Sequence, residues 1–352
     1  MKTTSRQSRF LGAAFFASLV LWTGAGRLSA QTGTYSETLL VTDVTGLGQK
    51  QDPNLSNPWG LAAVPGNPWW VSDNNSGLST LYDGQGNIES LVVTIPPSAS
   101  DPTALGSPTG IVANSTTDFG GSFFIFDTED GTISAWSGAP SASIVVDKGT
   151  AAVYKGLAMG QMNGANVLYA ADFRTGTIDV YDANFNPVTL ASGAFTDPKI
   201  PAGWAPLNVQ VMNGNVVVMF AKQDSAKHDE IDGPGLGQVD EFTSTGDLVM
   251  RFEHGAYLNA PWGAAIAPSD FGKFSGAMLV GNFGSGAIVA YDLTTGKALG
   301  LVDNVNGKPL VIPGLWALDF GLGGSTGPAN WLYFTAGPKN ETRGLFGYLV
   351  AN

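Results

Sequence analysis

Short apolar strands recur along the chain, each followed by a polar turn with glycine and then by alternating apolar and polar positions. Clear copies occupy residues 69–83, 123–137, 168–182 and 278–292, and in each the alternating stretch ends on Tyr or Trp. Alternation of β-branched and aromatic residues with polar ones is typical of antiparallel strands. Glycine in the turn accepts the positive φ of tight hairpins. After the first thirty residues no amphipathic helix of useful length appears, so the pattern predicts an all-β protein.

A short phrase near glycine opens each of these units and recurs six times. Counted at the last residue of each phrase, the spacings are 50, 46, 52, 55 and 54 residues. Units of about 50 residues with three or four strands are typical of propeller blades, so six phrases predict six four-stranded blades. The phrases are NPWG (57–60), SPTG (107–110), YKG (154–156), PLN (206–208), APWG (260–263) and GLWA (314–317).

The two ends of the sequence suggest how the ring closes. Residues 35–44 read as a lone strand before the first unit, and the last unit has no outer strand of its own. We expect the N-terminal strand to complete the sixth blade, because closure removes an open sheet edge. The alternative is a flat open array of sheets. The expected fold is therefore a six-bladed β-propeller of four-stranded antiparallel blades, in a single domain over residues 31–352.

The first thirty residues have the pattern of a signal peptide. Lys2, Arg6 and Arg9 precede an apolar run of 13 residues (10–22), which is short for a membrane span. We expect cleavage after Ala30, leaving a periplasmic or extracellular protein without a transmembrane segment. The alternative is an N-terminal membrane anchor.

Composition excludes several classes of function. The net charge is −12, from 17 basic and 29 acidic residues, which argues against a nucleic-acid partner. The absence of cysteine excludes disulfides, thiolate metal sites and cysteine nucleophiles. Two histidines cannot form a three-histidine metal cage. We expect a monomer that binds a small molecule or a protein at the mouth of its channel.

Strands that end in Asp, as at residues 71–73 and 170–172, resemble the NHL and SMP-30/gluconolactonase-like six-bladed propellers. Residues 56–86 and 220–242 resemble more closely a family of secreted bacterial proteins of uncharacterised function. The second resemblance implies the fold and no assigned activity. The first implies one divalent metal at the channel mouth, held by a Glu, two Asn and an Asp, and Asn57 stands where that Glu would be.

A ring of Asp and Asn side chains is the candidate metal site. Equivalent turns of successive blades gather on one face of a propeller, and oxygen ligands there suit Ca²⁺. The alternative is local, because Asp and Asn before a glycine turn hydrogen-bond their own backbone. The ring consists of Asn57, Asp73, Asp127, Asp172, Asn208 and Asn282.

An insertion at residues 222–237 interrupts the fourth unit and concentrates charge in a chain that is only 13% charged. His228 could act as a general base or metal ligand, with Asp229 or Asp224 orienting it. Loops on a rigid scaffold often carry function, so we expect these three residues to contact a ligand. The alternative is a solvated surface loop.

Three tryptophans of the opening phrases, Trp59, Trp262 and Trp316, are candidates for stacking on a sugar or an aromatic ligand. The alternative is packing between blades, which propellers require of bulky apolar residues.

Two functions remain open. The first is a binding module of the cell envelope. The second is a metal-dependent hydrolase of the lactonase type, in which Asp73 or Asp172, or His228 from the insertion, would activate water. Fold analogy alone cannot choose between them.

Overall fold

The computed structural model describes residue 1 and residues 33–352, and the signal peptide expected over residues 1–30 falls almost entirely outside them. The described residues 33–352 lie within one compact unit. In the described part of the chain, no helix has both the length and the apolar character needed to span a membrane.

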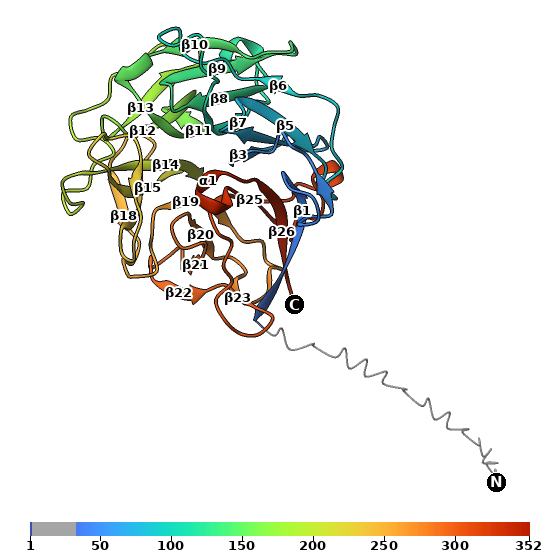
Figure 1. Ribbon diagram of the computed structural model, residues 1–352. Helices are drawn as coiled ribbons and strands as arrows, with labels where there is room; N and C mark the ends of the chain where they lie inside the picture. Colours follow the sequence, from blue (N-terminus) through green and yellow to red (C-terminus); the bar gives the residue numbers. More distant parts are fainter. Residues whose placement is uncertain (2–32) are drawn as a thin grey trace. The chain divides into compact units, whose positions relative to one another are not determined.

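Six antiparallel sheets surround one axis, as the sequence predicted (Figure 1). In each sheet the strand after the opening phrase is innermost. The third sheet has three strands, and its outer edge continues only as a bridge between Tyr181 and Pro187. The first three blades contain β3 (Pro58–Ala62), β4 (Trp69–Asp73), β5 (Leu78–Tyr82) and β6 (Val93–Thr94); β7 (Pro108–Ala113), β8 (Phe124–Thr128), β9 (Thr132–Trp136) and β10 (Ser143–Asp147); and β11 (Tyr154–Met162), β12 (Ala165–Asp172) and β13 (Thr177–Asp182).

The other three blades include the two irregular features of the ring. The insertion in the fourth blade forms a hairpin, because β16 (Glu230–Ile231) pairs with the end of β15. A four-residue helix, α1 (Pro338–Glu341), lies over the middle of the ring (Figure 1). The remaining strands are β14 (Trp204–Met212), β15 (Asn215–Gln223), β17 (Gly237–Phe242) and β18 (Leu248–Arg251); β19 (Pro261–Ile266), β20 (Met278–Asn282), β21 (Ile288–Tyr291) and β22 (Ala298–Leu301); and β24 (Leu315–Phe320), β25 (Leu332–Ala336) and β26 (Leu345–Ala351).

The N-terminal strand closes the ring, which confirms the expected closure. β1 (Thr34–Thr42) runs antiparallel to β26, with register from Tyr35 opposite Ala351 to Thr42 opposite Leu345. β1 is thus the fourth strand of the sixth blade, next to β26, β25 and β24 (Figure 1). Its other edge pairs in parallel with two short strands, β2 (Lys50–Gln51) and β23 (Asp303–Asn304). These strands cover both ends of an edge whose unpaired backbone groups could otherwise recruit another chain.

Every inner strand carries a β-bulge at its opening phrase. Over this stretch the inner strand has one more residue than its partner, as between Pro58 and Leu61 opposite Asp73 and Val71. A bulge changes the direction in which its side chain points. The equivalent shifts occur at Pro108/Ile111, Tyr154/Leu157, Pro206/Asn208, Pro261/Ala264 and Leu315/Leu318.

Apolar side chains fill the spaces between neighbouring sheets. The first and second blades meet through Trp70, whose ring stacks on Phe124 with centroids 4.1 Å apart. The fifth and sixth blades meet through Tyr35, Phe271 and Phe274. The core is therefore a ring of wedges rather than one central cluster, as sheet-on-sheet packing requires.

Tyr35 links ring closure to the neighbouring blade and offers a test of it. Its hydroxyl donates to the carbonyl of Phe271 at 3.0 Å and accepts from the backbone N–H of Phe274 at 3.2 Å. Tyr35→Phe leaves both buried backbone groups without this partner, so we expect unfolding in urea to require about 1–3 kcal/mol less free energy. Tyr348→Phe, on the adjacent strand with a partly exposed ring, is the control. Equal stability of the two variants would contradict this role for Tyr35.

Candidate functional site

The bulges bring five large side chains together at the channel axis. Trp59 stacks on Trp316 with ring centroids 3.5 Å apart, and Trp262 meets the two edge-on at 6.0 and 5.8 Å. The three indoles are at most 2% exposed. They pack on one another across the axis, and a role in stacking on a ligand stays a prediction. We call this set the axial layer: Trp59, Lys155, Leu207, Trp262 and Trp316.

Lys155 occupies the position in the third blade that tryptophan occupies in three others. Its side chain is 1% exposed, and its Nζ lies 5.0 Å from the centroid of the Trp59 ring. The indole N–H of Trp262 donates to the Lys155 carbonyl at 2.7 Å. Lys155 is not among the site residues expected from the sequence. The available signal was the phrase YKG, which places a lysine where NPWG and APWG place an aromatic ring.

Acidic side chains from two blades surround this buried cation. Nζ of Lys155 lies 2.5 Å from Glu129 Oε1, 3.3 Å from Asp229 Oδ1 and 3.8 Å from Glu230 Oε2. Burial alone would lower the pKa of Lys155, but the three carboxylates raise it above its usual value, so the ammonium stays charged. Glu230 Oε2 is itself buried and has no hydrogen-bond partner.

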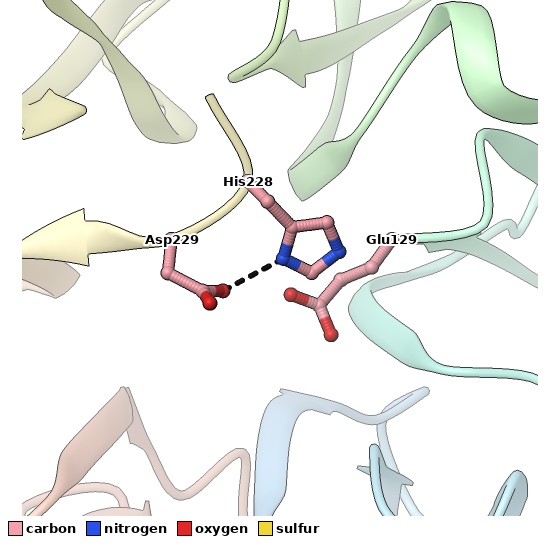
Figure 2. Close-up of side chains that lie close together, drawn as sticks. All are labelled: Glu129, His228 and Asp229. Carbon is pink, nitrogen blue, oxygen red and sulfur yellow. Dashed lines mark hydrogen bonds and ion pairs between the residues drawn. The ribbon is translucent and has the colours of Figure 1, made fainter. Parts of the chain in front are cut away.

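The insertion supplies His228 to the same place. Its Nδ1 lies 2.8 Å from Asp229 Oδ1, and Figure 2 shows Glu129 reaching toward the pair from the opposite side. The hydrogen bond to Asp229 raises the pKa of His228, and the same bond lowers the pKa of Asp229. Asp224 shapes the loop instead, since its carboxylate accepts the backbone N–H of His228 at 2.9 Å.

Glu129, His228 and Asp229 each offer one ligand atom, and these atoms lie within 4.8 Å of one another. Among the described residues, this is the one group of three or more His, Asp or Glu side chains with that geometry. Of the residues expected from sequence to carry function, the structure thus brings His228 and Asp229 together with Glu129, which follows directly after β8.

Backbone strain concentrates beside this group. Asn57 has φ of 48°, and Lys339, Asn340 and Glu341 in α1 have φ of 56°, 52° and 62°. Left-handed conformations of non-glycine residues are costly, and they persist where surrounding contacts impose them. Here the Asn57 amide donates to Glu341 Oε2 at 2.9 Å and accepts from the Trp316 indole at 3.1 Å. Burial, followed by the negative charge of Glu230, raises the pKa of Glu341 to about 7.

We call this end of the channel the acidic mouth. It is built from the starts of the inner strands and the turns that follow the second strands, which the antiparallel register places at the same end. It contains Glu129, Lys155, His228, Asp229, Glu230 and Glu341.

The ring of Asp and Asn side chains proposed from sequence lies fully buried beneath this mouth. Asp73 Oδ2 accepts from Thr80, and Asp127 Oδ1 accepts from the hydroxyl of Thr109 at 2.9 Å. Asp172 Oδ1 accepts the N–H of Val153 at 3.1 Å. Burial raises the pKa of Asp127 to about 7. The turn bonds of the local alternative are present at Asp172, whose Oδ1 also accepts from the N–H groups of Arg174 and Thr175, whereas Asp127 bonds across to the inner strand. One carboxylate oxygen each of Asp73, Asp127 and Asp172 is buried without a hydrogen-bond partner, and a shared cation stays a prediction.

The three amides of that ring are also engaged within the protein, Asn57 through the bonds to Glu341 and Trp316 already described. Asn282 Oδ1 accepts the N–H of Asn259 at 2.8 Å. Asn208 donates through Nδ2 to the carbonyl of Trp262 at 2.8 Å, which ties the fourth blade to the fifth.

Replacing Lys155, the buried ammonium of the acidic mouth, tests whether its charge stabilises the fold. Lys155→Met leaves the carboxylates of Glu129 and Glu230 uncompensated, so we expect a loss of roughly 3–5 kcal/mol in unfolding free energy at pH 8. Adding Glu230→Gln to this variant removes one of those charges and should restore part of the loss. Lys148→Met, which breaks the partly exposed pair with Asp179, is the control and should cost about 1 kcal/mol or less. Equal losses at Lys148 and Lys155 would contradict the argument.

Comparison with solved structures shows the fold. A protein of unknown function from Bacteroides thetaiotaomicron superposes with a TM-score of 0.56 at 12% identity, covering 90% of this chain and 76% of that one. Catalytically inactive virginiamycin B lyase from Staphylococcus aureus, with quinupristin, gives 0.54 at 11% identity, covering 91% and 99%. The expected likeness to six-bladed propellers is confirmed at the level of architecture.

No family model matches the sequence. Two proteins of Acanthamoeba polyphaga mimivirus are similar over most of their length. Uncharacterized protein L690 is 32% identical over 90% of this chain and 86% of its own length. Uncharacterized protein R648 is 31% identical over 89% and 80%. The bacterial and secreted character expected for the family stays a prediction. With this identity over this coverage, the chain belongs to the same family as the uncharacterized mimivirus proteins L690 and R648.

Proposed function

We propose that this protein is a ligand-binding propeller whose site is the acidic mouth, and that it binds its ligand with the help of a divalent cation. The observation that carries the proposal is the convergence of Glu129, His228 and Asp229 from two separate blades. Secretion through residues 1–30 is part of the same proposal and would locate this binding in the cell envelope or outside the cell.

The donor set argues for a transition metal. One imidazole nitrogen and two carboxylate oxygens suit Zn²⁺ or Mn²⁺, whereas Ca²⁺ prefers a shell of oxygens. The Ca²⁺ expected from the Asp and Asn ring is therefore not the cation proposed for this mouth. Lys155 opposes any cation here, and Glu230 and Glu341 offset that repulsion.

The mouth also has features that favour a polar ligand. The side chains of Asp229 and His228 are 66% and 41% exposed, so a small molecule can reach them. Three protein ligands leave coordination positions free for a ligand oxygen. Glu230 Oε2 is buried and receives no hydrogen bond, and Lys155 Nζ lies 3.8 Å away, so it is an acceptor that a hydroxyl or amine of the ligand would satisfy.

Metal titration tests this proposal. We expect calorimetry with Zn²⁺ and Mn²⁺ to show one site per chain, weakened at least tenfold in His228→Asn and Glu129→Gln. The loss of one charged or imidazole ligand is the physical reason. His254→Asn, which changes the other histidine of the chain, is the control. Equal binding by all variants, or no heat with either metal, would overturn the proposal.

A metal-dependent hydrolase of the lactonase type is the second candidate. A metal with three protein ligands and an open position lowers the pKa of a bound water and polarises a carbonyl. Asp73 and Asp172, expected from sequence to activate that water, are fully buried and bonded within their own blades. Glu341, with a pKa of about 7, is the better placed base for this reaction.

A panel of aliphatic and sugar lactones, with Zn²⁺, Mn²⁺ or chelator, decides between the two candidates. The hydrolase predicts turnover that chelator abolishes. It also predicts that Glu341→Gln lowers kcat at least a hundredfold while metal binding persists. Metal binding without turnover on any lactone would leave the binding function and exclude the lactonase.

A further inference from the structure

The channel has a second compartment, which the proposed function does not use. A cavity of about 540 Å³ is lined by all six inner strands, through their residues beyond the bulge. Representative lining residues are Ala62, Ile111, Met159, Gln210, Ile266 and Asp319. We call this cavity the far chamber. Its volume lies in the range of small-molecule sites.

The axial layer separates the far chamber from the acidic mouth. Trp262 lines the chamber, and its indole N–H points back to the carbonyl of Lys155. Trp59 and Trp316 stack against each other beside it and are almost fully buried. At the other end the chamber opens to solvent, since Asn213 and Leu322 on its rim are exposed. A molecule in the chamber therefore enters from the side opposite the acidic mouth.

Most side chains that line the chamber are apolar, and backbone groups of the inner strands supply much of its polar surface. Among the described lining residues, Asp319 on β24 is the one with a charged side chain. Its Oδ1 accepts the backbone N–H of Phe320 at 2.8 Å, and no cationic side chain in the described part of the chain forms an ion pair with it. Burial without a cation raises the pKa of this carboxyl to about 7.

A single carboxylate among mostly apolar side chains favours one kind of occupant. Neutral apolar molecules leave the carboxylate desolvated and unpaired, and anions are repelled by it. A cation that carries an apolar body neutralises Asp319 and also buries surface against Ile111, Met159 and Ile266. We propose that the far chamber is a binding site for organic amines, with Asp319 pairing the ammonium group and the inner strands enclosing the apolar body.

Benzylamine, with benzyl alcohol and benzoate as neutral and anionic counterparts of similar shape, tests the proposal. At pH 8 we expect calorimetry or ligand-observed NMR to show benzylamine binding at least tenfold more tightly than either counterpart. Asp319→Asn keeps the shape of the side chain and should weaken benzylamine binding at least tenfold. Asp303→Asn, in the short strand β23 and outside the chamber, should leave it unchanged.

Further variants locate the ligand and guard against misfolding. Ala113→Phe narrows the chamber from its half-exposed rim without touching Asp319, so it should also weaken benzylamine binding. Circular dichroism establishes that each variant is folded. Binding that survives Asp319→Asn but is lost in Glu129→Gln would place the amine at the acidic mouth and overturn the proposal. Equal binding of the three probes, or no binding of benzylamine at millimolar concentration, would also overturn it.

Failure here is distinguishable from failure of the proposed function. Metal binding depends on Glu129 and His228 at one end of the channel, and amine binding depends on Asp319 at the other end. Either result can hold without the other, because the axial layer lies between the two sites.

Discussion

Neighbouring inner strands approach one another very closely around the axis, and this approach constrains which residues they can carry. At Gly60, Gly110, Gly156 and Gly263, a Cβ atom would come within 2.5, 2.2, 1.9 and 2.3 Å of the next strand or of a side chain on it. Only glycine fits such an approach. The recurrent glycine of the opening phrases is therefore a packing requirement of the ring, besides the turn glycines that join its strands.

The functional architecture follows from that approach. A bulge accompanies each opening phrase, and it turns the residue before the glycine toward the axis. Three blades place tryptophan there and one places lysine. The indoles close the channel, and the lysine gathers acidic side chains above them. The two ends of one channel thereby acquire different chemistry, because one gathers several charged side chains and the other carries a single carboxylate among mostly apolar side chains.

The sequence predicted the blades, their number and the closing strand, because these depend on local periodicity and on repeat spacing. It did not predict the acidic mouth as a whole. Glu341 meets Asn57 across 284 positions, through a left-handed turn that no local pattern announces. In the sequence, Lys155 stood out only as a lysine at the position where three other opening phrases have tryptophan. His228 and Asp229 were found because charge is scarce elsewhere in the chain, which made their contrast informative.

The pairing of β1 with β26 has a consequence for how the protein reaches its fold. Tyr35 and Ala351 are neighbours in the finished sheet, yet they are among the first and last described residues to be synthesised. During translation the sixth blade cannot be completed until almost the whole chain has emerged, and contacts of such sequence separation form slowly. Until then, the edge of β1 that pairs with β26 and the apolar faces of the first and fifth blades stay uncovered. The seam that closes the ring in the native state is therefore the part that is exposed longest during biogenesis, when a chaperone would have most to shield.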